Sequence, residues 1–285
     1  MLRLLASALF AAPALAGQIT LATWNLEWFP SGIAFKTAPE EIENARVKAA
    51  ANTVRAHAPD IFFAQEIRDV ESCEKLAAAT GIKNFKLAVC TDFLDFEGNP
   101  IMQQCAIFTT HKVVETRSIK WQVFGIADPP RGAAYALLDV DGELLACFSL
   151  HLKSNLRRNP REQQLNILKR ELAIGQLLRF ISEMPPRPDG RAIKKFVVAG
   201  DFNTTLDEND YLSEGTIRNL LDDGFKNSFE NIIPAKRITL PAKGLYADVT
   251  FDYIFHKGFN KQNTVRFSAS NPAVSDHRMF SVVVE

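Results

Sequence analysis

Hydrophobic residues along this 285-residue chain occur in short runs separated by polar segments, with two kinds of spacing. Compact apolar runs such as residues 61–66 are typical of buried strands, while Leu165, Leu168 and Leu172, spaced three and four apart, share one helix face. We expect helices over 39–57, 70–79 and 160–184. We expect strands over 19–26, 61–66, 85–90, 104–109, 133–140, 143–152, 196–200, 249–256, 265–268 and 280–284.

Turn and capping residues define the limits of two of these elements. Asp141-Gly142 lies between two apolar runs and predicts a tight hairpin turn, whose central residues need positive φ. Asn159 predicts an N-cap for the long helix, with Pro160 at its first position. Hairpins mixed with crossover helices predict an α/β fold with helices packed outside two β-sheets. The proline-rich stretch 185–190 is then a surface loop inside one domain.

The first 16 residues have the composition of a targeting segment. Arg3 precedes an apolar run, and Ala14-Leu15-Ala16 has the small residues of a signal-peptidase site. The run is shorter than the roughly 20 residues that a membrane-spanning helix needs. We expect a signal peptide over 1–16 and a single domain over 17–285 that is secreted or periplasmic, the alternative being a buried N-terminal helix.

Charge and cysteine content narrow the function further. The formal net charge is zero, so no global positive field attracts nucleic acid, which weighs against a highly processive DNA binder. The four cysteines contain no C-x-x-C pair, so a structural zinc site is not expected. An exported chain permits disulfides, and four cysteines allow three full pairings. We favour Cys90–Cys105, because these residues end and begin neighbouring predicted strands, and we interpret Cys147 as a buried thiol.

Five short segments place a metal ligand or a proton carrier at the end of an apolar run: residues 23–26, 65–67, 149–154, 200–203 and 275–277. Glu66 follows a buried strand, where a carboxylate is costly unless it is paired or bound to metal. Asn25 adds a neutral oxygen at the end of the first strand. Oxygen ligands without a Cys or His cluster suit Mg²⁺ or Mn²⁺. Taken alone, Glu66 fits a solvated strand end and Asn25 a turn residue equally well.

Asp201 and Asn203 stand two residues apart after an apolar strand, so both side chains point the same way if the strand geometry continues. One of them can orient water, while the other donates to a phosphate oxygen. Gly200 is interpreted as leaving space for the substrate to approach. The alternative for this segment is a polar turn.

Two histidines, His151 and His277, are the predicted proton carriers, because each can titrate near neutral pH. Asp252 lies inside an apolar strand and needs a buried partner, so we pair it with His277, as an acid fixes the imidazole tautomer in a catalytic triad. A hydrogen-bonded core acid is the alternative for Asp252. The other histidines are interpreted as structural: His57, His111 and His256.

Basic residues near these segments are candidates for phosphate binding. Arg131 opens a strand, and a guanidinium can bind a phosphate through two parallel hydrogen bonds, although a surface arginine is an equally good interpretation. Six basic residues against the single acid Glu162 form a patch suited to a polyanion, or a solvated helix face. They are Lys153, Arg157, Arg158, Arg161, Lys169 and Arg170.

The order of Asn25, Glu66, His151, Asp201/Asn203, Asp252 and Asp276/His277 resembles the endonuclease/exonuclease/phosphatase superfamily, the DNase I-like fold, over nearly all of the mature chain. The resemblance implies a four-layer α/β sandwich of two packed mixed β-sheets flanked by helices, with the site at one edge. It implies that Glu66 holds Mg²⁺, or Mn²⁺, with help from Asn25 and Asp276. It further implies His277 as general base, His151 as acid for the leaving group, and Asp201 with Asn203 as water-orienting and phosphate-binding groups.

Two departures from the family pattern refine this expectation. The apurinic-site repair branch has a Tyr and an Asn where this chain has residues 151–154, which argues against a repair enzyme. DNase I-like nucleases carry a Glu that supports the histidine at the position of His151, and the nearest counterparts here are Gln103 and Gln104.

These observations predict an exported, Mg²⁺-dependent phosphodiesterase, a monomeric nuclease with nucleic acid as substrate and no stable protein partner. The alternative is a sphingomyelinase-type phospholipid phosphodiesterase, which would need an exposed apolar loop such as residues 93–96 or 28–30. A small-molecule phosphatase and a non-catalytic binding protein are further alternatives, and the latter predicts lost ligands.

Overall fold

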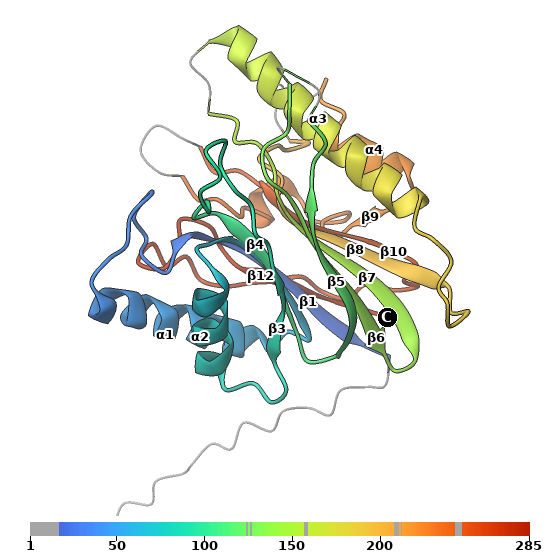
Figure 1. Cartoon of the computed structure of the whole chain (residues 1–285), viewed down its shortest axis with the longest axis horizontal. Helices are drawn as coiled ribbons and strands as arrows, with labels where there is room; N and C mark the ends of the chain where they lie inside the picture. The colour runs from blue at the N-terminus through green and yellow to red at the C-terminus, as the bar shows by residue number, and fades with distance from the viewer. Residues whose placement is uncertain are drawn as a thin grey trace, which may run out of the picture.

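Two mixed β-sheets pack face to face between two layers of helices in the computed structural model (Figure 1). The structure describes residues 17–285 except 124, 126, 157–158, 208–210, 212 and 243–246, so the expected signal peptide lies outside the described residues. Helices α1 (Glu40–His57) and α2 (Val70–Thr80) cover the first sheet, and α3 (Pro160–Ser182) and α4 (Thr216–Asp222) cover the second. This arrangement confirms the predicted four-layer α/β sandwich.

Each sheet has six strands, and its central strands are parallel. The first sheet has the order β11 (Arg266–Phe267), β12 (Phe280–Val284), β1 (Ile19–Phe29), β2 (Ile61–Ile67), β4 (Gln104–Thr109) and β3 (Lys86–Cys90). The second has the order β5 (Lys112–Lys120), β6 (Gly132–Val140), β7 (Glu143–His151), β8 (Ile193–Asp201), β10 (Asp252–Lys257) and β9 (Lys226–Asn227). In the described chain, no helix has both the length and the hydropathy to cross a membrane.

Several local predictions are confirmed. Asn159 caps α3 by accepting a hydrogen bond from the Glu162 amide at 3.0 Å. Asp141 and Gly142, both with positive φ, join β6 to β7. Strand β2 is buried along its whole length because α1 and α2 cover one face and the second sheet covers the other.

The short elements and one edge strand were not predicted from the sequence. Strand β5 has polar residues and partly exposed faces, which hide its apolar pattern. Helix α4, strand β9 and the 3₁₀ helix η2 (Pro234–Lys236) are too short for a periodic signal.

The predicted apolar face of α3 is wrong. Leu168 is exposed, whereas Arg170 is buried and its guanidinium binds both carboxylate oxygens of Glu214 at 2.6 and 2.7 Å. The helix therefore presents a paired cation to the interior, which hydrophobic spacing cannot reveal.

Strand direction places six candidate residues at one edge of the sandwich. β1 and β2 are parallel and so are β7 and β8, so the carboxyl ends of each pair lie together. β10 runs antiparallel to β8, and β12 runs antiparallel to β1, so the starts of β10 and β12 lie at the same edge. The segments brought together there carry Asn25, Glu66, His151, Asp201, Asp252 and His277.

Gly200 serves strand packing rather than substrate access, so its interpretation from the sequence is wrong. Its φ is +143°, and a Cβ atom there would lie 2.0 Å from the Leu150 carbonyl oxygen of β7. Any side chain would push β7 and β8 apart just before His151 and Asp201. Gly200 thus positions both residues through the backbone.

All four cysteines are free thiols in this structure, and the predicted Cys90–Cys105 pairing is wrong because these two residues lie on opposite faces of the first sheet. Cys90 pairs in register with Ala106 and packs toward the helix side of the first sheet. Cys105 is the next residue on β4 and faces the other sheet. Adjacent residues of a strand point to opposite faces, so neighbouring strands do not bring these two thiols together.

We expect acid to destabilise the fold through His57. Its ring is 6% exposed, its Nδ1 lies 2.8 Å from the Ser281 hydroxyl, and burial together with the charge of Arg266 lowers its pKa to about 4. In the unfolded chain this histidine binds a proton near pH 6.5, whereas in the folded protein it binds one only near pH 4. The free energy of unfolding is therefore highest above pH 6.5 and decreases as the pH falls toward 4. The full effect is roughly 3 kcal/mol. In His57→Gln, the melting temperature should fall less than in the wild type as the pH is lowered from 6.5 to 4. If the melting temperature of the variant depends on pH as in the wild type, His57 is not the cause.

Candidate active site

The six candidate residues from Asn25 to His277 meet at one edge of the sandwich, here called the catalytic edge. The Asn25 side chain joins two carboxylates there. Its Nδ2 donates to Glu66 Oε1 at 3.1 Å and to Asp201 Oδ2 at 2.9 Å. Its Oδ1 accepts the Glu27 backbone N–H at 3.0 Å, and the Trp28 N–H donates to Glu66 Oε2 at 3.1 Å. The amide of β1 thereby connects the end of β2 in one sheet to the end of β8 in the other.

Several non-glycine residues at this edge have positive φ, the left-handed backbone conformation. Five of the nine non-glycine residues with positive φ in the described chain lie here: Glu27, Trp28, Glu66, Arg131 and Asn203. Side-chain clashes make this conformation costly for such residues, and it persists where surrounding contacts enforce it. At Glu66 it coincides with a register shift between β2 and β4. The strained backbone thus aims the carboxylate where a regular strand would not.

His277 and Asp252 form the predicted pair. His277 Nδ1 donates to Asp252 Oδ2 at 2.7 Å, while His277 Nε2 lies 3.9 Å from Asp201 Oδ2 and from Asp276 Oδ1. Burial alone would lower the pKa of His277, but Asp252 and the other carboxylates outweigh burial and raise it to about 10. The ring therefore carries a proton at neutral pH while these acids are charged.

Asp201 is the most perturbed carboxyl group of the site. It is 2% exposed and opposes Asp252 directly in the β8–β10 register. Burial and the charge of Asp252 raise the pKa of Asp201 to about 7, against the opposing effects of His277 and Asn25. Asn203 supports the same carboxylate, because its backbone N–H donates to Asp201 Oδ1 at 2.9 Å. A positive charge bound here would relieve the repulsion between the two acids.

His151 faces the carboxylates without a supporting side chain. Its Nε2 lies 3.7 Å from Glu66 Oε1 and from Asp201 Oδ2, and its buried Nδ1 has no hydrogen-bond partner among the described residues. Burial, followed by the charges of Arg131, His277 and Lys153, lowers its pKa well below the usual value. Neither Gln103 nor Gln104 supports the ring: Gln103 contacts Arg131, and Gln104 contacts backbone and Thr91.

The guanidinium of Arg131 is already bound to the protein. Its Nε donates to the His151 carbonyl at 2.9 Å, one terminal nitrogen donates to Gln103, and the other donates to the Leu152 carbonyl at 2.7 Å. Asn203 Nδ2 donates to the same Leu152 carbonyl. The structure therefore presents Arg131 as a brace for the end of β7, and its predicted phosphate contact stays a prediction.

Asp276 joins the site from the loop before β12. Its backbone N–H donates to the Glu27 carboxylate at 3.1 Å. Ser275 Oγ donates to the Asn25 carbonyl at 2.7 Å and accepts the His277 N–H at 3.0 Å. This loop is thus hydrogen-bonded to the end of β1, which carries Asn25.

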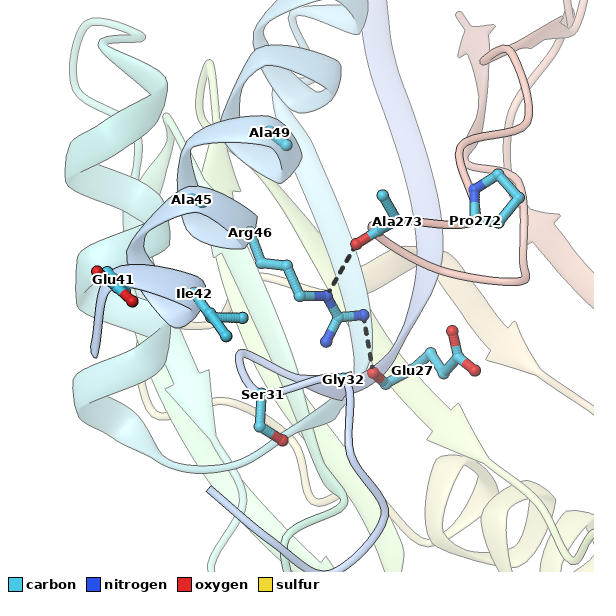
Figure 2. Close-up of a pocket in the computed structure, with 10 residues that line it drawn as sticks. All are labelled: Glu27, Ser31, Gly32, Glu41, Ile42, Ala45, Arg46, Ala49, Pro272 and Ala273. Carbon is cyan, nitrogen blue, oxygen red and sulfur yellow. Dashed lines mark hydrogen bonds between the residues drawn. The ribbon is translucent and has the colours of Figure 1, made fainter. Parts of the chain in front are cut away.

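Arg46 of α1 holds the end of β1, which carries Glu27, against the loop that carries Asp276. Its guanidinium donates to backbone carbonyls at the end of β1 and in residues 273–274, and it lies beside a cavity of about 730 Å³ (Figure 2). The carbonyls occupy the arginine, and acidic Glu27 and Glu41 lie along the cavity wall. The cavity therefore offers no free cation to a phosphate, and its lining supports the loops beside the site.

Among the described residues, one member of the predicted basic patch is buried rather than accessible. Arg170 is buried against Glu214, and Arg157 and Arg158 lie outside the described residues. Lys153 is half-buried two residues after His151, and burial together with Arg131 and Lys169 lowers its pKa. Lys153, Arg161 and Lys169 remain as accessible cations of this segment within the described chain.

Sequence reasoning missed two polar residues that the fold places beside the site. Glu27 contacts the Asp276 backbone, and buried Gln65 donates from Nε2 to Ser149 Oγ at 3.0 Å, linking the two sheets. An acid two residues after Asn25 was a usable signal for Glu27. Nothing local marks Gln65, whose partner is 84 residues away.

The donor set fits a hard divalent cation. Glu66 and Asp201 offer buried carboxylate oxygens next to the Asn25 amide, and Asp252 Oδ1 is buried without a partner among the described residues. In the described chain, Asp201, Asp252 and His277 present ligand atoms within 4.8 Å of one another. His277 Nδ1 is already committed to Asp252, so the oxygen-rich side near Glu66 is the better fit.

Comparisons with known proteins agree with this geometry. A family model described as Endonuclease/Exonuclease/phosphatase family matches residues 22–277. Truncated TDP2 from Caenorhabditis elegans has 15% identity and a TM-score of 0.62, with 94% of this chain and 98% of that chain covered. An endonuclease/exonuclease/phosphatase from Bacteroides vulgatus has 16% identity and a TM-score of 0.64, with 94% and 98% covered. D. rerio TDP2 complexed with single-strand DNA product has 15% identity and a TM-score of 0.65, with 94% and 99% covered. No curated protein matches the chain.

Proposed function

The chain belongs to the endonuclease/exonuclease/phosphatase family, whose members are phosphoric ester hydrolases, and from this premise we propose that it is a Mg²⁺-dependent nuclease. The observation that carries the proposal is the network around Asn25, whose amide binds both Glu66 and Asp201. Residues from both sheets, up to 176 positions apart, converge on it. Cleavage of a phosphodiester requires clustered oxygen ligands and proton carriers of this kind.

The cation in this proposal is held by Glu66, Asn25 and Asp276. When bound, it supplies positive charge that offsets the charge of the phosphate and of the developing transition state. Glu66 is already oriented by the hydrogen bond from the Trp28 N–H. Asn25 turns its Nδ2 to Glu66 and Asp201 and its Oδ1 to the Glu27 N–H, so its amide would have to rotate to offer Oδ1 to the cation. An all-oxygen set of this kind fits Mg²⁺, with Mn²⁺ as an alternative.

The protein groups divide the remaining work. Asp252 fixes the Nδ1 proton of His277 and leaves Nε2 facing Asp201, where it can bind a phosphate oxygen. His277 serves as general base once the negative charge of its neighbours is offset, because those acids keep its pKa at about 10. Asp201 and Asn203 orient the water and the phosphate, and His151 Nε2 serves the leaving oxygen between Glu66 and Asp201.

Nucleic acid is the proposed substrate. The D. rerio TDP2 structure is of a complex with single-strand DNA product, and that likeness supports the fold, while the substrate of this chain is our inference. Lys153, Arg161 and Lys169 beside the end of β7 provide the basic surface. Because cations of this kind bind phosphates, we expect binding to weaken as the salt concentration rises, measurable by fluorescence anisotropy between about 50 and 200 mM salt.

Cleavage of supercoiled plasmid tests the function. The protein spanning residues 17–285 is incubated with Mg²⁺, with EDTA, and with Mg²⁺ after His277→Ala substitution. Metal-dependent nicking that the variant loses supports a nuclease at this site. A folded protein that leaves plasmid intact, yet hydrolyses a simple phosphodiester with Mg²⁺, would retain the chemistry and exclude the nucleic-acid substrate.

A phospholipid phosphodiesterase is the second candidate, and exposed apolar side chains near the site favour it. In the segment 93–96, Phe93 is buried but Leu94 is half-exposed and Phe96 is fully exposed. In the other candidate segment Phe29 is buried, while Trp28 packs against the exposed Phe35 with ring centroids 4.4 Å apart. Flotation with sphingomyelin liposomes, compared with a Phe96→Ser variant, separates lipid docking from the nuclease proposal.

Export is proposed from the sequence of residues 1–16 alone. Expression of the full chain, followed by N-terminal sequencing of the processed protein, tests it. A mature protein that starts at Gly17 supports the proposal, and retention of Met1 contradicts it.

A further inference from the structure

Two cysteines outside the active site are neighbours in the same hydrophobic cluster. Cys73 on α2 is completely buried against the first sheet, and Cys90 is half-buried at the end of the edge strand β3. Helix α2 packs against β3, and the two thiols are near enough for Cys90 to add to the effect of burial in raising the pKa of Cys73. The contact therefore joins an outer helix to the edge of a sheet, and none of the groups assigned to catalysis takes part.

Strand register gives an independent reason for this pairing. Cys90 lies opposite Ala106, and Ala106 belongs to the same hydrophobic cluster as Cys73, between the first sheet and its helices. Cys105 and Cys147 belong to the other cluster, between the two sheets. The sheet itself separates Cys73 and Cys90 from the remaining thiols.

We propose that Cys73 and Cys90 are the site of a disulfide, which forms when the chain meets a small disulfide oxidant such as glutathione disulfide. The Cys90 thiolate attacks one glutathione sulfur and releases one glutathione thiolate. The Cys73 thiolate then attacks Cys90 Sγ of the mixed disulfide and releases the second glutathione. Two protein thiols thus lose two protons and two electrons, and the glutathione disulfide is reduced to two thiols.

Exposure decides the order of these steps. Cys90 is the accessible thiol, so it meets the oxidant first. Burial and the contact with Cys90 raise the pKa of Cys73 well above the usual value, which makes the second step slow in the folded protein. Oxidation during refolding should therefore be faster than oxidation of the native protein.

The bond would tie α2 to β3 and close the chain between residues 73 and 90. A loop of this length removes conformational freedom from the unfolded chain, and the expected rise in melting temperature is roughly 5–10 °C. The proposal is independent of the nuclease activity, because its readouts are a covalent link and a melting temperature.

Peptide mapping of the wild-type chain tests the pairing directly. The protein spanning residues 17–285 is refolded with reduced and oxidised glutathione, alkylated and digested without reduction. Trypsin alone leaves Cys90 and Cys105 in one peptide, residues 87–112, so a second cleavage before Asp92 is needed. The expected product links residues 69–75 to residues 87–91. Four alkylated cysteines, or a link through Cys105 or Cys147, would overturn the proposal.

Thermal unfolding with and without dithiothreitol provides the second measurement. Oxidised wild type and the Cys147→Ala control should lose the same several degrees on reduction, whereas Cys73→Ala and Cys90→Ala should show no dependence on dithiothreitol. A reductant effect that survives in Cys90→Ala would contradict the assignment. If either variant fails to fold, the wild-type peptide map still decides the pairing.

Discussion

Replacing His277 with alanine is expected to lower kcat by about 10²–10⁴-fold, the scale on which a positioned acid or base contributes. The ring is held by Asp252 at 2.7 Å and faces Asp201 and Asp276, so no other group of the described site can take its place. Asp252→Asn should cost a similar factor, because the amide accepts through one oxygen only and no longer holds the imidazole by a charge. Initial rates on plasmid or a simple phosphodiester measure both effects.

A matched control separates chemistry from folding. His111 lies after β4, at the edge of the sandwich opposite Glu66, because β4 runs antiparallel to β2. His111→Gln should keep the rate of the wild type, and all variants should keep the far-ultraviolet circular dichroism spectrum. If the kcat of His277→Ala stays within threefold of the wild-type value, this histidine has no role in the mechanism.

Replacing Glu66 with glutamine is expected to lower turnover by about 10²–10⁴-fold and to weaken Mn²⁺ or Mg²⁺ binding at least tenfold. Glutamine keeps the size of the side chain but removes the charge. It also presents an amide donor to Asn25 Nδ2 or to the Trp28 N–H, both of which are donors to Glu66. Calorimetric titration with the cation, in the absence of substrate, measures the binding loss separately from catalysis.

Glu71 offers the control for this substitution. It is an exposed glutamate in the first turn of α2, and its carboxylate pairs with Lys75. Glu71→Gln should bind the cation and turn over like wild type. Equal cation affinity in Glu66→Gln and wild type would exclude Glu66 as a ligand, even if its activity were reduced.

The catalytic edge depends on backbone and amide groups as much as on the acids and histidines. Asn25 separates two carboxylates by donating to both, Arg131 holds the carbonyls at the end of β7, and Ser275 fixes the loop before His277. Such supporting bonds hold strained residues in place and pre-orient the site. Substitutions at these supports should change rate and stability together, whereas substitutions at Glu66 or His277 should act mainly on rate.

Much of the fold could be predicted from sequence because its signals are local. The apolar run of β2, the Asp141-Gly142 turn and the Asn159 cap depend on residues within a few positions, and all three are confirmed. The prediction of the buried face of α3 was wrong because Arg170 is buried there and is stabilised by Glu214, 44 residues away. The edge strand β5 was not predicted because its residues are partly exposed and show no clear apolar pattern.

The sequence by itself determined which polar residues follow apolar strands, and therefore the family and the candidate list from Asn25 to His277. The tertiary structure alone decided how those residues meet: Asn25 contacts Asp201 across 176 positions, Gly200 lies against Leu150, and Arg131 binds carbonyls of β7. It also decided that Cys90 faces Cys73 and not Cys105. The reason is physical. Residue type and local spacing set the direction of a side chain within its own element, but strand pairing and sheet packing, formed between distant residues, set its neighbours, its burial and its pKa.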